Sequence, residues 1–255
     1  MCNLIKAELF KLAKSYVYRI LLAVVVCFEI FWIYSTYIVA GVHATGAEWL
    51  TIMVPYMLFN LVFLCLFATS FVIGEFRSRT FSYGLMCGHT RIEIFSAKTV
   101  VFYIAMIPFI MIHALIGAIM LSVWNGQGFG RSFNTDTIIY VSTMLAFSII
   151  GHCVAASQIL LLAVLTRSRI ITIGVGVIGF YIPYIICANL KFIKDPVVYE
   201  RWHFVMQFTR TYQIVALVDY PDEHVSLFIF MIISLVTFAM YISIAGFIFA
   251  KRDLK

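Results

Sequence analysis

Charged side chains are scarce in this sequence. Asp, Glu, Lys and Arg together make up 12% of the 255 residues, whereas a soluble domain carries about 25%. Hydrophobic residues make up 63%, and the mean hydropathy is +1.01. Because a soluble fold has too little interior to bury so much apolar surface, the composition excludes an ordinary soluble domain and places the chain among membrane proteins.

Motifs that would give the chain its own chemistry are also missing. It has no G-x-x-x-x-G-K-[ST] phosphate loop, so we expect no ATP binding by that route and no enzymatic activity of the chain itself. No nucleophile and base occur at a recognisable spacing, which argues against an intramembrane enzyme. We also expect no metal and no cofactor, because no C-x-x-C pair occurs among the six cysteines: Cys2, Cys27, Cys65, Cys87, Cys153 and Cys187.

Long apolar runs dominate what remains. A helix rises 1.5 Å per residue, so about 20 apolar residues cross roughly 30 Å of hydrocarbon. A transmembrane β-barrel would instead show segments of about ten residues with alternating polarity, a pattern that does not occur here. We therefore predict an all-α integral membrane protein forming one domain over residues 1–255, with six transmembrane helices at 20–40, 52–73, 99–123, 137–165, 170–190 and 225–250.

Basic residues indicate the topology, because Lys and Arg beside a span stay on the cytoplasmic side. Most of the 18 lie before the first span, between spans 2 and 3, between spans 4 and 5, or after span 6. Both termini and segment 74–98 are therefore predicted to be cytoplasmic. The net charge of +6 then reflects topology and attraction to anionic lipid, and no nucleic-acid partner is expected.

Residues 1–19 predict an amphipathic helix in the membrane interface. Ile5, Leu9, Leu12, Ala13 and Tyr16 fall on one side of a helical wheel, and the lysines at 6, 11 and 14 fall elsewhere. The alternative is a simple cytoplasmic extension of span 1. A basic start and small residues at 42–44 also suit a cleaved signal peptide, but the apolar run exceeds the 7 to 15 residues usual for one.

The loops between the spans differ in character. The first two outer loops, GVHATGAEW and WNGQGFGRSFNTD, carry residues typical of ordinary turns. The third, 191–224, is apolar and aromatic in its middle, and is predicted to form short helices that re-enter the outer leaflet.

Segment 74–98 is the polar interval between spans 2 and 3. Residues 80–87 can form two helical turns, Gly88 is placed for a left-handed cap, and TRIE at 90–93 is a capping box that starts a new helix. Exposed apolar residues among charges are typical of a partner surface, and here they are Phe81, Tyr83, Leu85 and Met86. The alternative is a helix that lies on lipid.

The order of residues in this segment resembles a known family. Glu75, Thr80, Gly88, Thr90, Arg91 and Lys98 occur in the order typical of ABC-2 type permease subunits of ABC exporters. LIKAELFKLAKS at the start and AKRDLK at the end resemble the ends of these permeases, so the likeness covers the whole six-span plan. Arg79 departs from the family, which often has glycine before the threonine.

This resemblance implies a type V exporter-like permease without its own motor. Residues 1–19 would be an elbow helix, and 191–224 would supply the re-entrant outer helices. The partners would be a cytosolic ATPase that binds ATP and Mg, a second permease chain that is identical or paralogous, and membrane lipid. Segment 74–98 would hold the coupling helix, with ATPase-coupling residues Glu75, Arg79, Thr80, Phe81, Tyr83, Leu85, Met86, Arg91 and Lys98.

Several polar residues lie within the predicted spans. An acidic residue near the centre of a span costs roughly 3 kcal/mol to insert, so Glu29 is expected to face protein or water. The candidates for a translocation path are Glu29, Asn60, His113, His152 and Gln158. Interhelical hydrogen bonding in the packed bundle is the alternative for each. Glu29 is placed in a span distant from both histidines, which weakens a metal or proton-relay hypothesis.

Together these features predict an ATP-driven exporter permease in a bacterial cytoplasmic membrane. The small size resembles permeases that expel or protect against antimicrobial peptides such as lantibiotics and bacitracin, and apolar spans suit an amphiphilic or lipid-like cargo. The alternative is a proton-coupled secondary transporter or channel that uses Glu29, His113 and His152.

Overall fold

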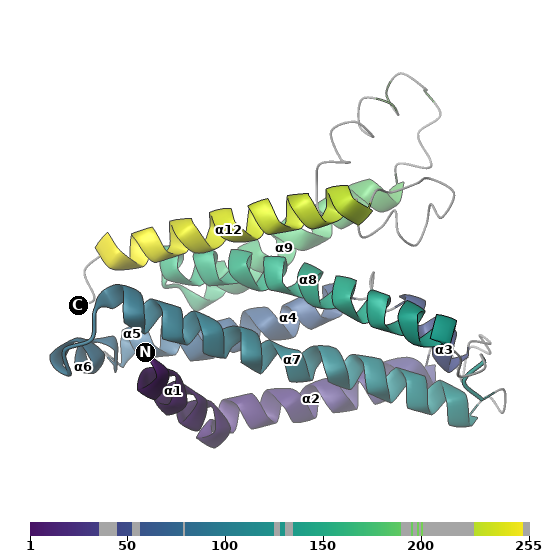
Figure 1. The fold of residues 1–255 in the computed structure, drawn as a ribbon, viewed down its shortest axis with the longest axis horizontal. Helices are drawn as coiled ribbons and strands as arrows, with labels where there is room; N and C mark the ends of the chain where they lie inside the picture. Colours follow the sequence, from purple (N-terminus) through teal and green to yellow (C-terminus); the bar gives the residue numbers. More distant parts are fainter. Residues whose placement is uncertain are drawn as a thin grey trace.

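The fold is a bundle of long helices (Figure 1). It is seen in a computed structural model that describes residues 1–35, 45–52, 57–78, 80–124, 128–130, 135–189, 195, 198, 200 and 227–251. No strand occurs among these residues. The helices in chain order are α1 (Cys2–Lys14), α2 (Tyr16–Ile33), α3 (Gly46–Ile52), α4 (Met57–Ala68), the π-helix η2 (Thr69–Ile73), α5 (Gly74–Arg77), α6 (Thr80–Met86), α7 (Arg91–Trp124), α8 (Thr135–Thr166), α9 (Arg169–Asn189) and α12 (Leu227–Lys251).

The six predicted spans all overlap helices, namely α2, α4 with η2, α7, α8, α9 and α12. By length and hydropathy, four stretches within the described residues can each cross a membrane: Tyr16–Ile33, Arg91–Trp124, Ile149–Thr166 and Met231–Lys251. A fifth crossing is possible if Asn60–Phe76 and Thr80–Met86, which meet at a 55° bend, count as one span. The all-α membrane class is thus confirmed, whereas the number six stays a prediction.

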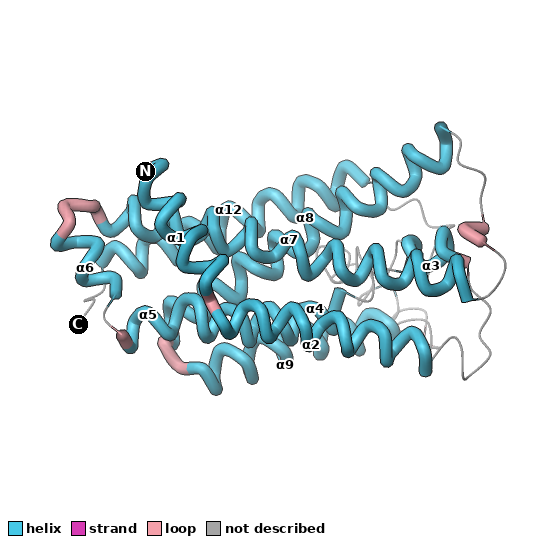
Figure 2. The backbone as a smooth tube through the Cα atoms, turned by 90° about the horizontal axis from the view of Figure 1, so that it is seen from below, coloured by secondary structure: helices cyan, strands magenta, loops and turns pink. Residues whose placement is uncertain are grey.

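The bundle has two distinct ends, which Figures 1 and 2 both show. The helix α1, the short helices α5 and α6, and the C-terminal end of α12 gather at one end. The short helix α3 lies at the opposite end, beside the last turns of α7. We call these the α6 end and the α3 end.

Aromatic side chains fill the core between α2, α4 and α7. The rings of Phe67 and Phe102 stack with centroids 5.4 Å apart, and Tyr18 packs on Phe67 at 5.3 Å and on Phe109 at 6.0 Å. The Tyr18 hydroxyl donates to the Ala105 carbonyl at 3.0 Å, which satisfies the polar group that burial would otherwise leave unpaired. Tyr18 therefore fixes the start of α2 against α7.

Three predictions about local structure need comment. The interface helix is present but ends at Lys14, and Tyr16 belongs to α2, because Ser15 is extended and its side chain accepts from the Tyr18 amide. The first outer loop was expected to be an ordinary turn, yet its end forms α3. The predicted re-entrant helices in 191–224 lie almost entirely outside the described residues.

Candidate functional site

Segment 74–98 folds as the sequence predicts at the α6 end. The chain leaves α5, makes the two turns of α6, and turns at Gly88, whose φ of +85° is in the left-handed region that favours glycine. The Thr90 amide donates to the Glu93 carboxylate at 2.9 Å, and the Glu93 amide donates to the Thr90 hydroxyl at 3.2 Å. These two bonds are the capping box that starts α7.

Phe81 anchors α6 to the bundle. The sequence predicts an exposed ring at this position, but Phe81 is 3% exposed, so that prediction is wrong. Its centroid lies 4.7 Å from that of Phe76 and 5.1 Å from that of Phe249 on α12. Leu85 is half-buried against the same cluster. The physical reason is the period of the helix: one side of α6 faces the end of α12, and Phe81 lies on that side.

The opposite part of α6 is exposed. Tyr83 is 64% exposed and Met86 is 72% exposed, and residues three apart lie on the same side of a helix. Thr80, at the start of α6, has its hydroxyl 2.6 Å from that of Ser78. Arg79 lies outside the described residues. We call Tyr83 and Met86 the exposed pair of α6.

A cluster of four charged residues lies beside α6 and joins α1, α5 and α7. The Lys98 amine lies 2.8 Å from the Glu8 carboxylate and 2.6 Å from that of Glu75. Lys11 completes the cluster through an ion pair with Glu8 and a 3.6 Å contact with Glu75. We call these residues the ion quartet. It carries two positive and two negative groups, so it can be buried without net charge.

Burial alone would raise the pKa of Glu8 and lower that of Lys11. Opposite charges outweigh burial in both residues: Lys98 and Lys11 hold the pKa of Glu8 below its usual value, and Glu8 and Glu75 hold the pKa of Lys11 above its usual value. Both shifts favour the charged forms. The network therefore stabilises the charged forms of Glu8 and Lys11.

The π-helix η2 leads directly into the quartet. π-turns are rare and are frequent at functional sites. Phe71, within η2, has its ring centroid 4.2 Å from the Lys98 amine, and the Phe81 centroid lies 5.5 Å from the same amine. Such cation–π contacts stabilise a partly desolvated ammonium group. Lys98 thus contacts α1, η2, α5 and α6 from its position on α7.

Two further contacts bring other parts of the chain to the α6 end. Arg91 donates to the Ala250 carbonyl at 3.1 Å, which ties the start of α7 to the end of α12. Arg167, in the turn between α8 and α9, places its guanidinium 4.5 Å from the Phe76 centroid. Its φ of +50° is unusual for a residue other than glycine.

Sequence reasoning missed Glu8, Lys11 and Arg167. Glu8 had a usable signal, because it lies one turn before Leu12 and therefore at the edge of the apolar side of α1. An acidic residue there needs a cation from another element. Nothing in the sequence identified Lys98 as that cation.

Four of the five intramembrane candidates are buried, and two of them are in contact. The Nδ1 atom of His113 on α7 lies 2.8 Å from the Glu29 carboxylate on α2, so the expectation that Glu29 is distant from this histidine is wrong. Asn60 on α4 and His152 on α8 are each 1% exposed. Gln158 is half-buried and faces Gly179 on α9. No group of three potential metal ligands occurs in the described parts of the chain.

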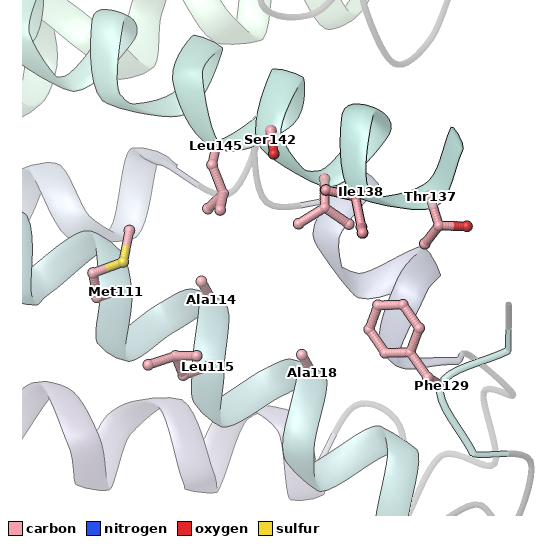
Figure 3. A pocket seen from close by; sticks show the side chains of 10 residues that line it. Met111, Ala114, Leu115, Ala118, Phe129, Thr137, Ile138, Ser142 and Leu145 are labelled. Atoms are coloured by element: carbon pink, nitrogen blue, oxygen red, sulfur yellow. The ribbon is translucent and has the colours of Figure 1, made fainter. Parts of the chain in front are cut away.

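An apolar crevice lies between α7 and α8 (Figure 3). Its volume is about 300 Å³. Met111, Ala114, Leu115 and Ala118 point into it from α7, and Phe129 lies at one end. The α8 wall consists of Thr137, Ile138, Val141, Ser142 and Leu145. A second apolar crevice of about 430 Å³ lies between α8 and α12. Both suit hydrocarbon better than a polar solute.

Comparison with known protein families gives a match. The family described as "ABC-2 family transporter protein" matches residues 4–183. The match includes the elbow-like α1, the ion quartet and segment 74–98. No curated protein matches the chain.

Proposed function

The chain belongs to the ABC-2 family of transporter proteins, and from this premise we propose that it is an exporter permease driven by a cytosolic ATPase that docks on α6. Membership makes the chain a multi-pass membrane permease of an ABC transporter, a class that works with an ABC ATPase. The docking surface, the direction of transport and the cargo are the proposed parts. We also propose that the ATPase binds the ATP and Mg and that the chain itself catalyses no reaction.

The observation that carries this proposal is the division of α6 into an anchored and an exposed part. Phe81 packs on Phe249 of α12 and lies beside Lys98 of the ion quartet, while Tyr83 and Met86 are exposed. A helix that is held rigidly by the permease, yet presents an aromatic and a methionine, can transmit a push from a bound partner. Arg91 and Glu75 contact other helices of the permease at this junction, namely α12 and α7.

Copurification tests the docking surface. We expect the affinity-tagged full-length chain to bring an ABC ATPase from membranes of its own cell, and Tyr83→Ala with Met86→Ala to lose it. The matched control is Ile119→Ala. It removes a side chain about as exposed as Tyr83, but from the part of α7 near the α3 end of the bundle. If the double variant retains the ATPase in full, docking on α6 is wrong.

The cargo is proposed to be amphiphilic, either a lipid-like molecule or an antimicrobial peptide such as a lantibiotic or bacitracin. The apolar crevices beside α8 support this, because they offer hydrocarbon-like surface within the membrane region. The working assembly is proposed to have two permease chains in a bacterial cytoplasmic membrane. Resistance of cells that express the complete transporter, compared with cells that lack this chain, tests the peptide cargo.

The contact between Glu29 and His113 favours one alternative, a proton-coupled transporter that needs no ATPase. In that case a pH gradient would drive cargo transport by the purified chain alone, and Glu29→Gln would abolish this transport. An exporter driven by an ATPase predicts no such movement without ATP. The family match supports the ATP-driven function.

A further inference from the structure

The short helix α3 closes the α3 end of the bundle through a single large side chain. Trp49 is fully buried, and its indole N–H donates to the His113 carbonyl at 3.1 Å. The Trp49 and His113 rings lie 5.0 Å apart. Ile33 of α2 and Leu121 of α7 complete the apolar cluster around the indole. Trp49 therefore covers the point where α2 and α7 meet.

Two glycines allow α3 to pack closely against α7. A Cβ atom on Gly117 would lie 1.9 Å from Trp49 Nε1, and one on Gly46 would lie 2.2 Å from the Ser122 hydroxyl. Neither glycine has a positive φ, so the requirement is for space and not for backbone conformation. Any larger residue at Gly117 has to displace the indole.

A polar pair lies directly under the indole. His113 and Glu29 are 3% and 1% exposed, and they contact each other at 2.8 Å. The second carboxylate oxygen of Glu29 and Nε2 of His113 have no hydrogen-bond partner among the described residues. From 99 to 123, α7 has no Asp, Glu, Lys or Arg, so this stretch of α7 supplies no further ion-pair partner to Glu29 or His113.

We propose that Glu29 and His113 form a polar site on the transport path, and that α3 is a gate whose Trp49 seals this site at rest. The site takes water and the hydrogen-bonding groups of a passing amphiphile. This inference rests on the proposed function, because a gate needs a path to close. Beyond the proposed function, it identifies α3 as the gate and Trp49 as the residue that seals it.

The unsatisfied polar atoms make the seal reversible. A buried polar group without a partner is destabilising, and this cost is recovered when water reaches the group. The closed state is stabilised by the burial of Trp49 and by its hydrogen bond to the His113 carbonyl. The open state is stabilised by the hydration of Glu29 and His113. A seal over a purely apolar site would lack this second contribution. The seven residues of α3 are also too few to be a stable helix alone, so α3 depends on these contacts.

Labelling of a cysteine under the seal tests the gate. Ile33→Cys is made in a full-length chain whose six native cysteines are replaced by alanine, and its reaction with a water-soluble maleimide is timed in nanodiscs. We expect slow labelling at rest. Trp49→Ala and Gly117→Ala should each speed it at least about tenfold, which corresponds to about 1.4 kcal/mol. Trp49→Phe, which keeps an aromatic ring but loses the hydrogen bond to the His113 carbonyl, should label at a rate between those of the parent and Trp49→Ala.

Leu64→Cys is the matched control, since Leu64 is equally buried in the main core away from α3 and should stay unlabelled in every background. Unchanged labelling of Ile33→Cys in Trp49→Ala would overturn the seal. With the ATPase bound, ATP turnover should also speed labelling. No increase in a complex that still transports would overturn the gate and leave the proposed function intact. The Trp49→Ala comparison uses the purified chain, so it tests the seal even if no ATPase partner exists.

Discussion

The amine of Lys98 lies 2.8 Å from the carboxylate of Glu8, although the two residues are 90 positions apart in the chain. Both side chains are almost fully buried. This contact joins the elbow-like α1 to the start of α7, and Glu75 adds the end of the preceding span. One ammonium group on α7 therefore contacts α1 and α5 through ion pairs and the Phe81 ring of α6 at 5.5 Å.

Lys98→Met is predicted to destabilise the permease strongly. The substitution keeps the length of the side chain but leaves Glu8 and Glu75 with only Lys11, and removing one partner of a buried ion pair costs about 3–5 kcal/mol. The free energy of unfolding in detergent measures this. Lys6→Met on the exposed side of α1 is the control, with an expected change within about 0.5 kcal/mol. A similar small change for Lys98→Met would mean that the quartet contributes little.

Alanine substitutions of Phe81 and Tyr83 are predicted to have different effects on stability and on ATPase binding. Phe81→Ala removes a buried ring and should destabilise the chain by about 3–5 kcal/mol. Tyr83→Ala should leave stability within about 0.5 kcal/mol and weaken ATPase binding. Thermal unfolding and copurification of the same two variants separate the effects. Equal destabilisation by both would show that α6 is a packing element without an exposed docking side.

Local signals in the sequence predicted much of the fold. Hydropathy located the helices, and TRIE located the start of α7 because both halves of a capping box are sequence neighbours. The same signal was present in TGAE at 45–48, where Thr45 and Glu48 form the capping box of α3. It was overlooked because a seven-residue helix makes almost no hydropathy pattern.

Tertiary contacts were not predictable in the same way. The contact of His113 with Glu29 depends on how α2 rotates against α7, and the burial of Phe81 depends on where α12 ends. Neither is set by residues nearby in the chain. Segment 74–98 was therefore predicted correctly as a short helix, a turn and a new helix, while its buried and exposed residues could not be told apart.

Loss of the Thr90 cap is predicted to loosen the start of α7. Thr90→Ala removes the acceptor for the Glu93 amide and should cost about 1 kcal/mol. The Thr90 backbone and side-chain hydrogen bonds also hold the pKa of Glu93 below its usual value. Hydrogen exchange of the amides at 91–94 should be faster in Thr90→Ala. Thr90→Ser keeps the hydroxyl and should exchange like the parent, and an unchanged rate in Thr90→Ala would contradict the role of the cap.

The contribution of Glu8 to stability is predicted to depend on pH. Burial alone would raise its pKa, but Lys98 and Lys11 outweigh burial and lower the pKa in the folded chain. In the unfolded chain a glutamate titrates near about 4.3. A group whose pKa is lower when folded stabilises the fold fully above the unfolded value, and loses that contribution as the pH falls through the folded value.

The melting temperatures of the parent and Glu8→Gln should therefore differ most near neutral pH and converge in acid below pH about 4. Glutamine keeps the size of the side chain and removes the charge, so the difference reports the contribution of the Glu8 charge. Lys11 has the opposite sign: its raised pKa means that its contribution persists below about pH 10.4 and is lost as the pH rises through the folded value. A difference between parent and Glu8→Gln that stays constant from neutral pH into acid would show that Glu8 acts by packing and not by its charge.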